Sequence, residues 1–490
     1  MTWRPRDGTA TALALASAAA VAFAVAARPG PLGALVLVAA ALLAVALRKA
    51  PTRTVRSAAS AVAALGPASV AVAPLAPLAP LASVPAAVLV ALPFGAIGAT
   101  LRPGAGGPAA VRQAVWIASA WCALEAGWGS TALLGSWALP TMAVGSSLAD
   151  GPGLALAGWV GVRGMSWLAI AGGASLPGVP GVPARASVAA LAVAALTAST
   201  PFAPAADAAD PSRPATPSGG TIAVRVVQTA PTPASIAALR FDEARERAHA
   251  AFLREHVRGA AEAARLVIWP EATLPRPWRL DDPGARPPLV PAGADVLFGA
   301  ATMRDGGLFN SALLWHGGRL SVVADKVRLV PLTEAALTPG SPRPPALWLD
   351  RRIAALICWE AVFPGSARAL ARAGADLLVV LANDAYAGDG PVPRLHLRMA
   401  RLRAAEVGLP VVFSQATGPS AAIASDGRVL ARLPAGRAAS LDVDLPGATG
   451  ATLYRRTGDL VGPGASIACL LIVARRLRRP VDATRRGGDA

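Results

Sequence analysis

Long apolar runs fill the first two hundred residues and limit what this chain can fold into more than any other feature. Each run is close to the ~20 residues that a helix needs to cross a bilayer. Composition agrees, because 54% of the residues are hydrophobic and only 15% are charged. The sequence predicts spans at residues 9–27, 31–47, 58–80, 84–101, 111–128, 153–176 and 185–203, with an eighth at 458–474.

Two of these runs have alternative interpretations. Arg4 and Arg6 precede the first run, as in a signal peptide, but the later spans favour an uncleaved helix. The repeat "APLAPLAPL" within residues 73–81 could form a kinked span or a re-entrant segment, since each proline removes a helical hydrogen bond.

Basic residues predict the orientation of the bundle. If the N-terminus is cytoplasmic, the short loops on that side hold nearly all the loop cations, whereas the opposite short loops hold only Arg28. This is the positive-inside pattern, and it predicts an even number of spans. Six arginines also lie in the basic tail, residues 475–490. The other cytoplasmic cations would be Arg4, Arg6, Arg48, Lys49, Arg53, Arg56, Arg102, Arg112 and Arg185. Arg163 falls inside the sixth span, where a charge marks either function or snorkelling towards the surface.

The remaining sequence differs from the first two hundred residues in its composition and its pattern of apolar residues. A linker rich in Pro, Ala, Ser and Gly occupies residues 204–220, after the bundle of residues 1–203. Strand-like runs then alternate with charged helical stretches, expected at 236–263 and 395–408. This pattern predicts an α/β domain at 221–445, a connector at 446–457, the last span and the tail. Lying between spans seven and eight, the domain is expected outside the cytoplasm.

The three cysteines and the net charge of +17 limit the classes of function that the chain can have. Cys122, Cys358 and Cys469 lie far apart without CxxC spacing, which argues against a zinc site or a disulfide framework. The positive charge flanks apolar runs, and no nucleic-acid-binding motif accompanies it. Cys358 ends the strand-like run "IAALIC", where a cysteine is either a small buried hydrophobe or a nucleophile.

Two other reactive groups occur near strand-like runs of the same domain. Glu271 comes directly after "RLVIWP", and Lys326 stands at the start of the short run "KVRLVP". A thiol becomes nucleophilic when a base takes its proton or a cation stabilises its thiolate. Because α/β folds gather their sites at strand ends, Glu271, Lys326 and Cys358 are the candidate catalytic residues.

The ordered motifs "WPEATLP", "DKVRLVP", "ICWE" and "ANDAYAGDGP" followed by "HLRMARLRAAE" resemble the carbon–nitrogen hydrolase, or nitrilase, superfamily. Within it they are most similar to the apolipoprotein N-acyltransferase family. The resemblance implies a protein of the cell inner membrane with eight spans and a periplasmic α-β-β-α sandwich domain.

The resemblance also implies roles for the residues. Glu271 would be the general base, Lys326 the cation that stabilises the oxyanion, and Cys358 the nucleophile. Glu334 and Glu360 would support them, or brace loops structurally. Trp359, Asn383 and Tyr386 are weaker substrate-binding candidates, which could equally be core aromatics or turn residues. His396 is expected on a helix face and receives no role.

The implied reaction is ping-pong acyl transfer. An acyl chain would pass from a phospholipid to Cys358 as a thioester, and then to the N-terminal amine of diacylglyceryl-cysteine on an apolipoprotein. No metal or diffusible cofactor is expected, no nucleic acid takes part, and a monomer is expected. Leu332, Leu337 and Phe363 could form a lipid entry surface or belong to the core. Arg455 and Arg456 could meet lipid phosphates or merely flank the last span.

Several positions depart from the family pattern, including Thr333, Ala335, Ala387, Phe413 and Ala416. These changes lie around the expected triad and put the choice of acyl donor and acceptor in doubt more than the reaction type. Two alternatives therefore stay open. One is a membrane-tethered amidase or hydrolase of the same superfamily. The other is a divergent, non-catalytic lipoprotein-binding paralogue.

Overall fold

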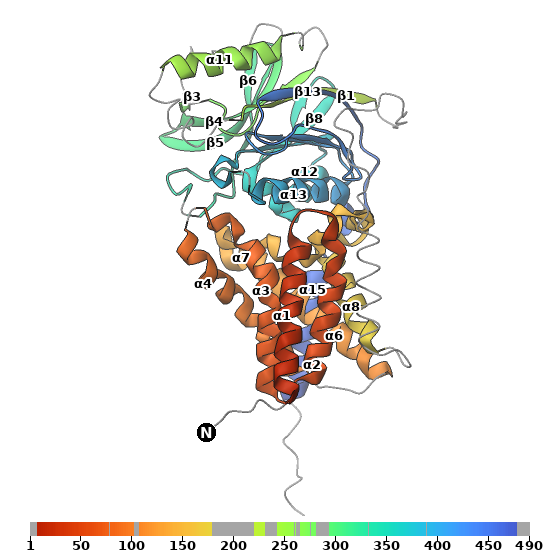
Figure 1. Ribbon diagram of the computed structural model, residues 1–490. Helices are drawn as coiled ribbons and strands as arrows, with labels where there is room; N and C mark the ends of the chain where they lie inside the picture. Colours follow the sequence, from red (N-terminus) through yellow and green to blue (C-terminus); the bar gives the residue numbers. More distant parts are fainter. Residues whose placement is uncertain are drawn as a thin grey trace, which may run out of the picture.

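A helical bundle carries an α/β sandwich domain at one end in the computed structural model of this chain (Figure 1). The structure describes residues 7–77, 79–101, 107–178, 220–230, 243–258, 260, 265–274, 276–280, 294–331, 333–388 and 390–477. The predicted seventh span, nearly all of the linker and the predicted helix start at 236–242 lie outside these residues.

Apolar helices form the bundle, and close packing of alanines holds them together. Four helical segments of the described part are long and apolar enough to cross a membrane: Gly8–Ala27, Pro31–Lys49, Pro80–Thr100 and Pro152–Ser175. They coincide with four of the predicted spans. The bundle helices are α1 (Asp7–Ala27), α2 (Leu35–Lys49), α3 (Arg53–Ala71), α4 (Pro80–Ala91), α5 (Gly95–Thr100), α6 (Gly107–Trp128), α7 (Thr131–Leu134), α8 (Ala157–Ser175) and α15 (Val461–Leu477).

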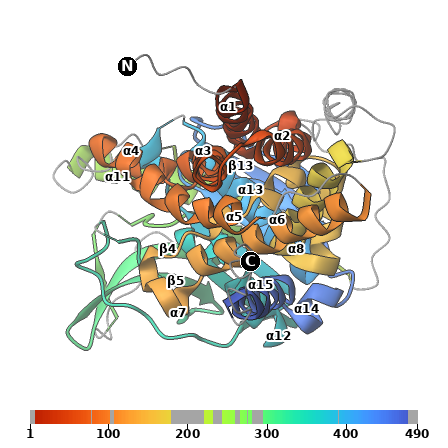
Figure 2. The same ribbon diagram turned by 90° about the horizontal axis from the view of Figure 1, so that it is seen from below.

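Three other predicted spans are helical but less apolar or shorter. Helix α3 carries Arg53 and Arg56 in its first turn, α6 contains Arg112 and Glu125, and α15 has 17 residues. Helix α15 packs against α6 and α8, so the last described helix returns to the N-terminal bundle (Figure 2).

The α/β domain consists of two stacked sheets between helices. One sheet has the order β13-β1-β2-β4-β5-β6, with β3 beside β4, and the other has the order β12-β11-β10-β9-β8-β7. Apolar side chains of both sheets form one shared core. Helix α11 (Glu243–Val257) covers the first sheet, while α12 (Pro364–Arg372) and α13 (Val392–Val407) lie between the second sheet and the bundle (Figure 1). This is the predicted α-β-β-α order.

The strands of the first sheet are β1 (Thr221–Gln228), β2 (Leu266–Ile268), β3 (Trp278–Arg279), β4 (Asp295–Arg304), β5 (Gly307–His316), β6 (Arg319–Asp325) and β13 (Ala439–Pro446). The second sheet contains β7 (Ala346–Trp348), β8 (Arg351–Ile357), β9 (Leu377–Ala382), β10 (Val411–Gln415), β11 (Ala421–Ile423) and β12 (Val429–Arg432).

Polar contacts join α13 to the bundle. Asp150, at the end of the 3₁₀ segment Val144–Asp150, accepts hydrogen bonds from Arg398 at 2.5 and 2.9 Å and from Arg401 at 2.7 Å. The Arg398 guanidinium also donates to the carbonyl oxygens of Ala27 and Arg28. Arg398 is almost fully buried, so these acceptors replace the water that its charge loses.

A break in helix α8 provides a second contact between the bundle and α13. Gly161 has φ +66°, and a Cβ there would lie 2.3 Å from the Tyr454 ring, so only glycine fits. Glu406 of α13 accepts a hydrogen bond from the freed Val162 N–H at 3.0 Å. The Tyr454 ring belongs to α14 (Leu453–Thr457), which precedes the last helix.

Arg163 and Arg455 have protein partners. Arg163 forms an ion pair with Asp459, just before α15. The Arg455 side chain donates to the carbonyl oxygen of Ala371 in α12. The Arg163 pair therefore fastens α8 to the start of the last helix, and the Arg455 contact fixes α14 against the domain.

Replacing Asp150 with alanine tests the contact between α13 and the bundle. The variant leaves the buried Arg398 without its carboxylate, so we expect a loss of about 3 kcal/mol in unfolding free energy. The matched control is Asp444→Ala, because Asp444 pairs with Arg265 at 3.0 Å but is 56% exposed. Loss of such a surface pair costs about 0–1 kcal/mol. Thermal unfolding in detergent measures both, and equal losses would contradict this view of Asp150.

Candidate active site

Strand ends from both sheets meet above α13 and bring the predicted residues together. Strands β1, β2 and β4 are parallel, as are β8, β9 and β10. Glu271 comes after β2, and Cys358 comes directly after β8. Lys326 comes after β6. Strands β4 and β6 both pair antiparallel with β5, so β6 runs parallel to β4. Lys326 begins the run "KVRLVP", which is not a strand in the structure, and lies at the end of β6, where the site forms.

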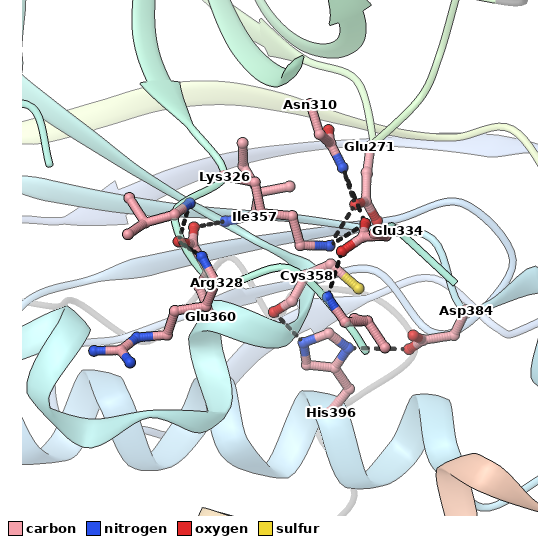
Figure 3. Close-up of polar contacts among 12 residues, drawn as sticks. Glu271, Asn310, Lys326, Arg328, Glu334, Ile357, Cys358, Glu360, Asp384 and His396 are labelled. Atoms are coloured by element: carbon pink, nitrogen blue, oxygen red, sulfur yellow. Dashed lines mark hydrogen bonds and ion pairs between the residues drawn. The ribbon is translucent and has the colours of Figure 1, made fainter. Parts of the chain in front are cut away.

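Lys326 lies between two carboxylates inside the domain. Its Nζ atom is 3.2 Å from Glu271 Oε1 and 2.7 Å from Glu334 Oε1, and its side chain is 1% exposed (Figure 3). Asn310 of β5 donates to Glu271 Oε1 at 2.7 Å. The Val330 N–H donates to the second oxygen of Glu334 at 2.7 Å. Both carboxylates are therefore fixed in place from more than one side.

Close packing of the backbone sets the position of Glu271. A Cβ at Gly299 of β4 would lie 2.6 Å from the Glu271 Cα and 2.9 Å from the Pro270 carbonyl oxygen. Any side chain at 299 would therefore push the carboxylate away from Lys326. Ala272, the next residue, has φ +53°, which turns the chain sharply after Glu271.

Cys358 also lies at a sharp turn, with φ +50° between β8 and the 3₁₀ segment Cys358–Val362. Such a backbone is unfavourable for a residue with a side chain and persists only where surrounding contacts hold it. His396 of α13 provides one contact, because its Nε2 lies 2.8 Å from the Cys358 carbonyl oxygen. The sulfur points into the space between the Lys326 group and Asp384 (Figure 3).

A chain of hydrogen bonds fixes His396 in turn. Its Nδ1 lies 3.0 Å from Asp384 Oδ2, and Gln415, at the end of β10, donates to that oxygen at 2.6 Å. Sequence reasoning left His396 without a role and did not select Asn310 or Gln415. His396 lies within the motif "HLRMARLRAAE", but the helical pattern does not show which helix face meets the nucleophile.

Glu360 connects the segment that follows β6 to the end of β8. It accepts hydrogen bonds from the Val327 and Arg328 N–H groups at 2.9 and 3.3 Å, and from the Ile357 N–H at 2.9 Å. Burial raises the pKa of its carboxyl group, although these hydrogen bonds act to lower it. These contacts match the bracing alternative for Glu360, since they position the residues beside Lys326 and Cys358.

The weaker candidates lie around this centre. Asn383 accepts a hydrogen bond from the Ala385 N–H at 3.2 Å and so shapes the local turn. Tyr386 is 41% exposed at the rim. Trp359 stacks edge-on with Phe363 at 6.0 Å and joins the apolar cluster between domain and bundle. Phe363 is buried, which favours the core alternative over the entry surface, and Leu332 lies outside the described residues.

Electrostatics favour a protonated thiol in the resting site. Burial and the nearby Glu271 charge raise the pKa of the Cys358 thiol, and Lys326 only partly opposes them. Burial lowers the pKa of Lys326, but Glu271, Cys358 and Glu334 outweigh it and raise that pKa above its ordinary value. The site is therefore suited to attack in which a base removes the thiol proton, with an ammonium in place throughout.

Comparison with known proteins agrees with this geometry. Residues 293–452 match the carbon–nitrogen hydrolase family model.

Curated relatives include an apolipoprotein N-acyltransferase from Sinorhizobium medicae, 33% identical over 263 residues, which are 46% of this chain and 48% of that protein. Another, from Bradyrhizobium diazoefficiens, is 33% identical over 260 residues, 44% of this chain and 46% of that protein. The chain is thus similar to these N-acyltransferases, and its match spans about half of their length.

Solved structures with a similar domain include a CN-hydrolase superfamily protein from Xanthomonas campestris. It is 20% identical, with a TM-score of 0.36, covering 49% of this chain and 96% of that one. An amidase from Nesterenkonia sp. is 22% identical, with a TM-score of 0.34, covering 46% of this chain and 91% of that one.

Alkylation of Cys358 tests the thiol's protonation state. We expect the iodoacetamide labelling rate, in a Cys122→Ser/Cys469→Ser background, to rise with pH through a midpoint above 9, the ordinary value for a cysteine. Lys326→Met should move the midpoint higher, because the ammonium favours the thiolate. Mass spectrometry of the labelled peptide measures the rate. A midpoint below about 7, as in cysteines that rest as thiolates, would contradict the arrangement.

Proposed function

We propose that this protein transfers an acyl chain from a phospholipid, through a thioester on Cys358, to the N-terminal amine of diacylglyceryl-cysteine on apolipoproteins. The observation that carries the proposal is the buried group of Glu271, Lys326 and Glu334 around Cys358, in a domain that packs directly on apolar helices. The named N-acyltransferase relatives support the choice of reaction.

In the first half-reaction, Glu271 takes the Cys358 proton as the sulfur attacks the sn-1 ester carbonyl. The negative charge that develops on the carbonyl oxygen is stabilised by the Lys326 ammonium, which is already in place and needs no reorganisation. The carbon–oxygen bond then breaks, the lysophospholipid alkoxide takes the proton from Glu271, and the acyl group remains on sulfur.

The second half-reaction uses the same residues. The lipoprotein amine attacks the thioester, Glu271 receives the amine proton, and the carbon–sulfur bond breaks to give the amide. The departing thiolate regains a proton, which restores Cys358. A thioester reacts with amines more readily than an oxygen ester does, so the covalent step divides one difficult transfer into two easier ones.

The arrangement of the chain suits lipid substrates. The start of α1 lies beside the end of α2, since a Cβ at Gly8 would lie 2.9 Å from the Lys49 carbonyl oxygen. The opposite end of α1 meets α13 through Arg398. The domain is therefore remote from Arg48 and Lys49, which supports an extracytoplasmic position under the positive-inside rule. We accordingly propose eight spans in the cell inner membrane, a periplasmic domain and a monomer, with the boundaries predicted from the sequence.

Product analysis with purified protein tests this function against hydrolysis. With phosphatidylethanolamine and a diacylated lipopeptide, we expect acylated lipopeptide and lysophospholipid in equal amounts. Cys358→Ala should abolish the product, Glu271→Gln should nearly do so, and Lys326→Met should slow it by at least ~100-fold. The control Cys469→Ser lies outside the site and should retain activity.

The outcomes separate the alternatives. Free fatty acid or ammonia without acylated lipopeptide would overturn acyl transfer in favour of an amidase or hydrolase. Binding of lipopeptide with no chemistry of either kind, in folded protein, would indicate the non-catalytic paralogue.

A further inference from the structure

Cys358, Asp384 and His396 form a cluster that acid–base acyl transfer does not fully use. One potential ligand atom from each residue lies within 4.8 Å of the others, and all three residues are at most 9% exposed. Around a tetrahedral zinc ion with bonds of about 2.0–2.3 Å, neighbouring ligand atoms are roughly 3.3–3.7 Å apart. The His396 Nδ1 to Asp384 Oδ2 distance of 3.0 Å is already close to this value. To complete three coordination positions, the sulfur would have to approach both atoms, and the ion would have to replace the His396–Asp384 hydrogen bond.

The hydrogen bonds behind the cluster are those that a metal-binding histidine needs. His396 Nε2 lies 2.8 Å from the Cys358 carbonyl oxygen, so that nitrogen donates its proton and Nδ1 faces Asp384. Metal-ligating histidines usually donate their other N–H to a carbonyl or carboxylate, which fixes the ring. Gln415 holds Asp384 from the far side at 2.6 Å. Two of the three ligands are therefore oriented before any ion arrives.

The surrounding charge favours a cation. Near the cluster, the single ammonium of Lys326 pairs with the two carboxylates of Glu271 and Glu334, which leaves that group with an excess of negative charge. A thiolate, an imidazole and a carboxylate select zinc or cobalt over magnesium or calcium, which prefer oxygen ligands throughout.

We propose that Cys358, His396 Nδ1 and Asp384 capture one thiophilic divalent cation such as Zn²⁺, with a solvent molecule in the fourth position, and that the captured ion blocks the nucleophile. Binding releases two protons to solvent, one from the thiol and one from between His396 and Asp384. The ion is an inhibitor, because its bond to sulfur occupies the lone pair that attacks the ester. Acyl transfer itself needs no metal. This site goes beyond the proposed function and does not depend on it.

Cobalt is the probe for this site because a thiolate bound to Co²⁺ gives a charge-transfer absorption band. We expect full-length protein in detergent to show this band with one Co²⁺ per chain, and Zn²⁺ to remove it by competition. Cys358→Ser should abolish the band, and His396→Gln should weaken Co²⁺ binding at least ~10-fold. Cys469→Ser, away from the cluster, should leave both unchanged. If the His396→Gln variant does not fold, Asp384→Asn is used in its place, because asparagine has nearly the same shape as aspartate.

The absorption is read without turnover, so it stands apart from the outcome of the acyl-transfer assay. A band that persists in Cys358→Ser, or no band in the parent protein at millimolar Co²⁺, would overturn the site. Where acyl transfer is present, Zn²⁺ should inhibit it reversibly, with recovery on chelation, while Mg²⁺ has no effect. If Zn²⁺ inhibits the Asp384→Asn variant with the same affinity as the parent protein, the proposed site is also overturned.

Discussion

The buried ammonium of Lys326 is the charge on which the rest of the site depends. Removing such an ion from water costs several kcal/mol unless opposite charges and hydrogen bonds replace the solvent. Glu271 and Glu334 do so at 3.2 and 2.7 Å, and Asn310 holds the first of them. The base and the oxyanion cation thus position each other, and Cys358 adds a protonated thiol beside an ion pair that is already complete. Loss of any one carboxylate would leave the ammonium undercompensated as well as remove a functional group.

Helix α13 connects this centre to the apolar helices. Its first turns carry His396, which holds the carbonyl oxygen of the nucleophile, and later turns carry Arg398 and Glu406, which bind the bundle. One helix therefore contacts the strained backbone of Cys358 on one side, and the end of α1 and the break within α8 on the other. The position of the nucleophile relative to the bundle is therefore set largely by its contact with this helix.

Apolar runs predicted an α/β domain, while the family resemblance implied its α-β-β-α layers and, through the ordered motifs, the group of Glu271, Lys326, Cys358 and Glu334. They could not give the register of the strands. Lys326 was placed at the start of the short run "KVRLVP", whereas the strand beside it is the preceding run, β6. Asn310 and His396 were missed for a related reason: a polar residue in a strand or helix gains a role only through side-chain direction and tertiary contacts. The count of eight spans stays a prediction, since the seventh lies outside the described residues and α3, α6 and α15 are less apolar or shorter than the four candidate spans.

The central claim is that the sulfur of Cys358 accepts an acyl group directly from a phospholipid. Incubation of the purified protein with phosphatidylethanolamine, without any amine acceptor, followed by mass spectrometry under mildly acidic conditions, tests it most directly. The account predicts one acyl mass on the peptide that contains Cys358, removed by hydroxylamine and absent from Glu271→Gln. An acyl group on another residue, or release of lysophospholipid with the Cys358 peptide unmodified in rapid-quench samples, would contradict it.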